Sequence, residues 1–521
     1  MLGKGIIQTL LILVFTALVT AAASAQQLNS SAPTECETLS YPGRFESQIS
    51  QAEYAQLQMK FEELAGEVEN LKRAASSNPN QIALVPDAQY AEPHWARAMT
   101  PGWERSRNPN WMGLGRRQRM TTQIARTGNM NLFLGLNTVG RVQYLQQYNV
   151  FDTVVPNSVV TGPLEPGIQT PFGQFSLLAD FDGAMEVYFD IYIATRPHED
   201  LLQADEGFLL LRQLPGPLGE NSLVNAFFER ANVKFGAFEI DYGDHHYRRS
   251  NNADVQRNPL IGNYVIDPRT TDIGAEIFSV PGAHFLNWLV GVGVGNTGDF
   301  QAERGWQFHG KLYGNSYVGL RPSVSFFWAD HAGNPTGFPN SGSKSDLFRS
   351  NRSGGPYEDV FAAGNAPGQV TPGNGQNVAA VEFDLTWQTA RQEIFGYCGM
   401  VQDSDTNGSA AGTPTESWMY YATEGVYRFT PRAYMAARYS AASALHLVSS
   451  ADNSRDVPSD GTIHRFQVGG GYWLHETILA KLEYVHEFAQ GFTADASQAS
   501  GIDVWRDPSF YGVLMEISFA F

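Results

Sequence analysis

The C-terminal stretch, residues 511–521, alternates between two kinds of side chain. One face is apolar and partly aromatic and carries Tyr511, Val513, Met515, Ile517, Phe519 and Phe521. The other face carries Gly512, Glu516, Ser518 and Ala520, with Leu514 as the exception. A period of two places alternate side chains on opposite faces of a β-strand. A strand with one apolar face is usually the wall of a soluble sandwich or barrel. Because this run reaches the last residue, ends on an aromatic and follows an export signal, it is instead typical of the closing strand of a transmembrane β-barrel, with lipid outside and water inside.

The N-terminus carries the features of an export signal. One lysine precedes an apolar run from Gly5 to Val19, and Ala23-Ser24-Ala25 forms a small-residue cleavage site before Gln26. This pattern predicts a signal peptide over residues 1–25, and a retained membrane anchor is the alternative. No later stretch has the 18 or more consecutive apolar residues that a membrane helix needs.

Residues 26–80 form a predicted periplasmic segment with a short coiled coil, placed over about 47–75. Its a and d positions are the core residues Tyr54, Leu57, Phe61, Leu64, Val68 and Leu71. Three heptads are marginal alone. The segment therefore indicates either an oligomeric coil, trimeric if the barrel trimerises, or a single amphipathic helix packed on another surface.

Residues 81–129 lack sustained periodicity and reverse the sign of the chain's charge. Seven arginines lie between His94 and Arg126 against one acid, Glu104, although the whole chain has a net charge of −18. We interpret the segment as an arginine-rich linker or as the periplasmic mouth of a pore. Contact with anionic lipid or with the cell wall stays open. The acidic total argues against nucleic-acid binding.

From residue 130 to 521 the period is two, with regular turn signals such as Asp182-Gly183. Sixteen strands are predicted near 130–147, 175–181, 185–193, 222–230, 233–241, 270–280, 285–297, 305–314, 316–329, 377–389, 392–403, 416–429, 432–444, 462–475, 477–489 and 510–521. Their connections alternate between long and short. The expected fold class is all-β, an antiparallel transmembrane barrel of about 16 strands after a short coiled-coil helix, a size that encloses an aqueous channel.

Charges at alternate positions mark the inner face of the barrel. In 185–193, Glu186 and Asp190 alternate with apolar residues, and Arg141 does so in the first strand. Charges at such spacing are costly in a dry core but suited to an aqueous lumen. We therefore predict that Arg141, Glu186 and Asp190 face the lumen.

The third long connection, 242–268, concentrates titratable groups. The candidate pore-constriction residues are Asp244, His245, His246, Arg248, Arg249 and Arg257. Apolar residues such as Tyr264 and Val265 suit a segment that packs against a surface. An inward loop with arginines opposite strand carboxylates would set up a transverse field. Alternatively the arginines pair with Asp244, Asp254 and Asp267 and hold the loop's shape.

The stretch VNAFFERANVKFGAFEIDYGDHHYRRSNN resembles the region of phosphate-selective-porin-like outer-membrane proteins in which two strands lead into the constriction loop. The C-terminus is similar to the ending by which bacterial outer-membrane proteins are recognised for insertion. The resemblance implies a sixteen-stranded porin whose third loop folds into the lumen. The strands lack the lysine-rich ladder of phosphate-selective members, so phosphate selectivity is not implied.

These features predict a porin in a bacterial outer membrane, in contact with its lipid and assembled as a homotrimer, for passive diffusion of small hydrophilic solutes or ions. A tether between outer membrane and cell wall, or a ligand-selective channel, is the alternative. No nucleophile-elbow or metal-ligand spacing is found, so no catalytic residue, metal or cofactor is expected. His245 and His246 are adjacent and point opposite ways in extended chain, which excludes a metal site shared by the two. Cys36 and Cys398 are expected to be free thiols.

Overall fold

The computed structural model describes residues 122–520, except 152–158, 165–166, 170–171, 194–201, 215–220, 246–247, 251–253, 269–270, 281–285, 295–305, 315–319, 331–347, 349–355, 358–359, 361–369, 371–376, 390, 405–414, 431, 449–455, 458–460, 476 and 492–507. The predicted signal peptide and coiled coil lie outside the described residues, as does most of the arginine-rich segment. Its described end forms a short strand, β1 (Thr122–Thr127).

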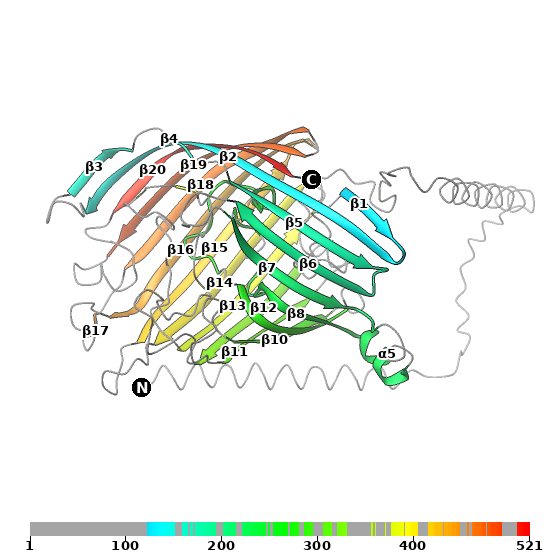
Figure 1. The fold of residues 1–521 in the computed structure, drawn as a ribbon. Helices are drawn as coiled ribbons and strands as arrows, with labels where there is room; N and C mark the ends of the chain where they lie inside the picture. Colours follow the sequence, from blue (N-terminus) through cyan, green and yellow to red (C-terminus); the bar gives the residue numbers. More distant parts are fainter. Residues whose placement is uncertain are drawn as a thin grey trace, which may run out of the picture. The chain divides into compact units, whose positions relative to one another are not determined.

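Sixteen antiparallel strands form a closed barrel within the described residues (Figure 1). The first eight are β2 (Met130–Phe151), β5 (Phe172–Phe181), β6 (Met185–Ile193), β7 (Leu202–Leu211), β8 (Ala231–Glu239), β9 (Thr271–Ser279), β10 (Leu286–Gly293) and β11 (Trp306–Gly314). The other eight are β12 (Leu320–Asp330), β13 (Asn377–Gln388), β14 (Gln392–Ser404), β15 (Thr415–Arg428), β16 (Ala433–Val448), β18 (Thr462–His475), β19 (Ile478–Gln490) and β20 (Ser509–Ala520). Three short strands lie in long connections: β3 (Val159–Pro163), β4 (Gly167–Ile168) and β17 (Asp456–Val457).

The barrel closes where β2 meets the C-terminal strand β20, which lie side by side in Figure 1. The lower-numbered half of β2 pairs with β5, and residues 137–148 pair with β20. Arg141 stands opposite Glu516 across this seam, and the two side chains form a buried ion pair at 2.6 Å. β1 pairs with residues 130–134 of β2 beyond the end of β20, so it extends the sheet at that edge.

The predicted alternation is present in the strands. In β20, Val513, Met515 and Ile517 are 40%, 57% and 53% exposed, whereas Leu514 and Glu516 are buried. Comparable exposed apolar side chains, including Trp288, Trp306 and Trp328, run along the outward faces of the other strands. A contiguous apolar exterior of this extent belongs against hydrocarbon, and closure leaves no unpaired strand edge there. Among the described residues, no helix is long and apolar enough to cross a membrane.

The hairpin between β5 and β6 confirms the predicted turn. Asp182 and Gly183 both have positive φ, 52° and 76°. Two positive φ values match the backbone twist of the flanking strands, and only residues such as Asp, Asn and Gly adopt them readily. The backbone N–H of Gly183 donates to the Asp180 carboxylate at 2.8 Å, which fixes the turn further.

One predicted strand, 222–230, is wrong. The segment forms the short helix α5 (Ser222–Phe228), and the Asn221 side chain caps it by accepting the N–H groups of Leu223 and Val224. The barrel strand that was not predicted is β7 (Leu202–Leu211). Its alternation of polar and apolar residues is interrupted by a bulge opposite Asp190. The total of sixteen is unchanged, but the β7–β8 connection is longer than the other turns at that end.

Most inward-facing side chains of the barrel are buried in the described residues. Arg141, Glu186 and Asp190 lie on this face and are buried. Near the end that carries the short turns, inward apolar side chains pack together. They are Phe133, Leu178, Tyr188, Phe208, Leu210, Phe238, Phe278, Leu289 and Tyr313. Other protein atoms cover these inward side chains.

Candidate functional site

The connection between β8 and β9 packs inside the barrel. This third loop is described at 240–245, 248–250 and 254–268, and it contains one turn of 3-10 helix, η5 (Asp254–Arg257). Tyr242, Ile261, Tyr264 and Val265 are fully buried. The loop contacts inward-facing side chains of strands from β11 to β20, as its hydrogen bonds show.

A loop inside a barrel needs partners for its backbone polar groups, since an unpaired buried N–H or C=O is costly. Two wall residues on β19 supply several of them. Glu483 accepts the N–H groups of Ile261 and Gly262 at 2.6 and 2.9 Å. The Lys481 ammonium donates to the carbonyl oxygens of Val255, Asn258 and Leu260 at 2.7, 3.2 and 2.9 Å.

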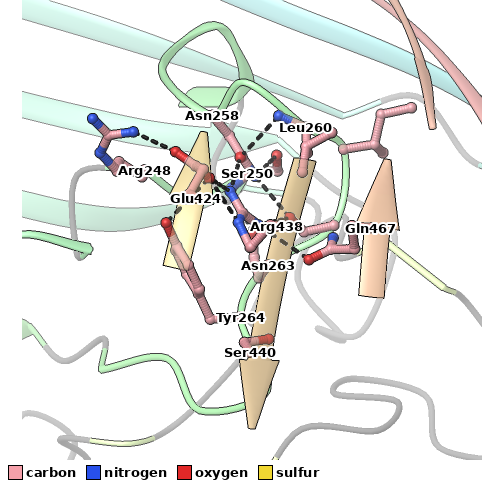
Figure 2. A network of polar contacts seen from close by, with 12 residues as sticks. Arg248, Ser250, Asn258, Leu260, Asn263, Tyr264, Glu424, Arg438, Ser440 and Gln467 are labelled. Atoms are coloured by element: carbon pink, nitrogen blue, oxygen red, sulfur yellow. Dashed lines mark hydrogen bonds and ion pairs between the residues drawn. The ribbon is translucent and has the colours of Figure 1, made fainter. Parts of the chain in front are cut away.

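Arg438 on β16 is the centre of the network in Figure 2. Its guanidinium donates to the Glu424 carboxylate on β15 at 2.7 Å, to the Gly262 carbonyl at 2.7 Å and to the Asn258 side-chain oxygen at 2.6 Å. It also lies over the Tyr264 ring, 3.9 Å from the centroid. One buried cation thus joins two strands to the loop, with charge-assisted bonds that are stronger than neutral ones.

Two further wall residues hold the same part of the loop. Arg465 on β18 donates to the carbonyl oxygens of Asn263 and Tyr264 at 2.9 and 3.3 Å. The hydroxyl of Ser440 on β16 accepts the N–H of Val265 at 3.3 Å. Every other residue along a β-strand faces inward, so the side chains of Arg465 and Ser440 point toward the loop.

The first part of the loop is held by β11, β12 and β13. The Asp244 carboxylate lies 2.9 Å from the Lys311 ammonium and 2.7 Å from the Arg321 guanidinium. Burial alone would raise the pKa of Asp244, but these two cations outweigh it and lower the pKa to about 2. Asp244 is therefore ionised at neutral pH.

His245 is enclosed between the loop and β13. Its Nδ1 lies 2.7 Å from Glu382 Oε1, and its ring stacks on Tyr397 with centroids 4.2 Å apart. Burial lowers the pKa of His245 to about 4. The imidazole is therefore neutral near pH 7 and adds no positive charge to the loop.

The predicted constriction arginines pair with strand carboxylates. Arg248 forms ion pairs with Glu424 and Glu393, and Arg249 pairs with Glu239 at 2.5 Å and donates to the Pro268 carbonyl at 2.7 Å. Arg257 is half-buried at the end of η5. His246 lies outside the described residues. The charges of Arg248 and Arg249 thus serve to dock the loop.

The wall residues that complete the site were not singled out in the sequence. They are Lys311, Arg321, Glu382, Asp384, Glu424, Arg438, Arg465, Lys481 and Glu483. Each is a charge at an inward position of a predicted strand, the same signal that marked Glu186 and Asp190. That rule, applied to every strand, would have found them.

A second connection, between β12 and β13, also reaches the third loop. The hydroxyl of Tyr357 donates to Glu483 Oε1 at 2.5 Å and accepts from the Gln467 side chain at 2.9 Å. The N–H of Val370 donates to the Val265 carbonyl at 2.7 Å, beside a parallel bridge between Ile266 and Val370. Two chain segments of different origin thus pack together inside the barrel.

No protein-family model and no curated protein matches the sequence. Solved structures with a similar fold include the outer membrane channel DcaP of Acinetobacter baumannii, with 10% identity over 77% of this chain and 99% of that one, TM-score 0.46. OmpT of Vibrio cholerae has 8% identity over 77% and 100%, TM-score 0.43. An anion-selective porin from Comamonas acidovorans has 11% identity over 75% and 100%, TM-score 0.42. Because the likeness is this distant, we base the function on the chain's own residues.

The barrel's own features define the class of protein. Sixteen strands closed edge to edge, an apolar exterior and a charged interior are the architecture of bacterial outer-membrane barrels. The protein is therefore located in a bacterial outer membrane.

Proposed function

We propose that the protein is a passive channel of the outer membrane for ions and small hydrophilic solutes, narrowed by the third loop. The observation that carries this proposal is the docking of that loop, by buried ion pairs, onto the inner wall of a membrane-spanning barrel. A loop held so firmly reduces the cross-section without moving aside. Sixteen-stranded barrels are wide enough to leave an aqueous path beside such a loop.

The charges at the loop support a channel that discriminates by charge. Arg248, Arg249 and Arg257 lie on the loop, and carboxylates such as Glu393 and Glu424 lie on the wall. Fixed charges of both signs at a constriction order water and act on passing ions. Because Arg248 and Arg249 are each paired, the field they add is smaller than that of free charges.

The buried inward side chains favour one alternative, a narrow ligand-selective channel, over a wide porin. The inward apolar cluster around Tyr188 and Phe208 is covered by protein atoms, which suits a restricted path. A tether between the outer membrane and the cell wall is the other alternative, and it needs no conduction at all.

Single-channel recording in planar bilayers tests the proposal. We expect steady conductance steps that are small for a barrel of this size, and Arg248→Met with Arg249→Met should shift the reversal potential toward cation preference. The variant Arg212→Met, which removes a cation paired with Glu186 away from the loop, is the matched control. Insertion of the protein into the bilayer without any conductance would contradict the proposed channel. An unchanged reversal potential in the loop variant would show that the third loop does not set the ion preference.

We further propose a homotrimer that contacts outer-membrane lipid and is extended by the predicted coiled coil. The support is the heptad pattern of residues 54–71 together with the large apolar exterior of the barrel. Contact with the cell wall through residues 26–129 belongs to the same proposal. Chemical cross-linking of the full chain in membranes should capture trimers, and deletion of 47–75 should weaken them.

A further inference from the structure

Three side chains with metal-binding atoms converge where the third loop meets β13. They are His245 from the loop and Glu382 and Asp384 from the strand, which we call the His245 cluster. One ligand atom from each residue lies within 4.8 Å of the others, and all three side chains are buried. Glu382 and Asp384 are two positions apart on one strand, so both face the loop.

The His245 cluster retains binding capacity that the protein does not use. His245 Nε2 is buried and makes no hydrogen bond. The other atoms are engaged: His245 Nδ1 contacts Glu382 Oε1, and Asp384 accepts from the Asp244 N–H and the Ser323 hydroxyl. Buried polar atoms are nearly always paired in native proteins, so the unpaired His245 Nε2 calls for a partner.

The backbone next to the cluster keeps the space between the ligands clear. Gly243 has a φ of +71°, and a Cβ there would lie 2.1 Å from Glu382 Oε1 and 2.8 Å from His245 Nδ1. Only glycine allows the loop to approach β13 this closely. The loop conformation thus brings the imidazole onto the two carboxylates.

We propose that the His245 cluster binds one divalent transition-metal ion of the zinc type, which ties the third loop to β13. One imidazole nitrogen with two carboxylate oxygens is a ligand set that suits Zn²⁺, whereas Ca²⁺ and Mg²⁺ prefer sites made of oxygen alone. The ion would join two residues, 245 and 382, that are far apart in the sequence. The proposed metal site explains how the third loop is attached to β13. It is therefore independent of the proposal that the barrel conducts ions.

Titration of the full chain in detergent with ZnCl₂ tests this proposal. The purified protein is stripped with EDTA, and zinc binding is followed by calorimetry together with the midpoint of thermal unfolding. We expect one zinc ion per chain and a higher midpoint with zinc. His245→Gln and, separately, Asp384→Asn should weaken binding by about tenfold or more, the scale seen when groups around a metal are removed. His464→Gln, on the outward face of β18, should bind zinc as the wild type does.

Folding of each variant is checked by its faster migration in unheated gel samples. If His245→Gln fails to fold, Asp384→Asn and the wild-type titration still decide the question. Stoichiometric zinc binding that both variants lose supports the site. No zinc binding by the stripped wild type, or equal binding by the folded cluster variants, overturns it. Binding of Ca²⁺ or Mg²⁺ as tight as that of Zn²⁺ overturns the assigned ligand chemistry.

Discussion

Arg438 is the residue whose loss should release the third loop most clearly. Its buried guanidinium bonds the Gly262 carbonyl and the Asn258 side chain of the loop, and the Glu424 carboxylate of the neighbouring strand. Arg438→Met keeps much of the side-chain volume and removes all three bonds. Glu424 keeps its ion pair with Arg248, so the variant does not leave that carboxylate without a cation.

The size of the effect follows from these contacts. Each hydrogen bond from a charged donor contributes about 1.5–3 kcal/mol, and the two bonds to the loop therefore sum to about 3–6 kcal/mol. We take the low end, about 3 kcal/mol, as the minimum effect of losing the two bonds. Since 1.4 kcal/mol corresponds to tenfold, the equilibrium for undocking of the loop should rise by about 100-fold.

Hydrogen–deuterium exchange of peptides covering 254–268 measures this equilibrium. In Arg438→Met the amides of Ile261, Gly262 and Val265, which bond wall side chains, should exchange about 100-fold faster than in the wild type. The matched control is Lys234→Met, which removes a buried wall cation paired with Glu276 on the next strand. It should leave these amides unchanged. Exchange of 254–268 within twofold of the wild type in Arg438→Met would refute the account of how the loop is held.

Two other predictions concern the exterior and the loop's glycine. Cys398 is exposed on the outward face of β14, so in a Cys36→Ser background a maleimide should label it slowly in intact membranes and rapidly after denaturation, because maleimides react with the thiolate, which forms poorly in hydrocarbon; equally fast labelling in both states would contradict the lipid-facing exterior. Gly243→Ala should lower the stability of the folded barrel by about 1–3 kcal/mol through backbone strain, and further through the clash with Glu382. The control is Gly183→Ala, where φ is 76° and no atom lies within 4 Å of the added Cβ. This variant therefore has the backbone strain without the clash. Similar denaturation midpoints for the two variants would argue against the close approach of loop and strand.

The barrel followed from the sequence because its determinants are local. An apolar outward face at every second residue and short turns such as Asp182-Gly183 are encoded within each hairpin. Fifteen of the sixteen predicted strands overlap a strand of the barrel, the exception being 222–230. That exception is itself informative. In β7 the inward residues Phe208 and Leu210 are apolar and a bulge shifts the pairing, so no alternation of polar and apolar residues remained to detect.

The sequence by itself determined that a closed barrel forms, where most of its strands lie and which connection carries the clustered charges. Only the tertiary structure decided which charges meet. Arg438 reaches Asn258 across 180 positions and Lys481 reaches Leu260 across 221, because barrel closure brings distant inward faces around one loop. It also decided that the inward side chains are buried and that His245 joins Glu382 and Asp384, since periodicity reports which way a side chain points but not what it meets there.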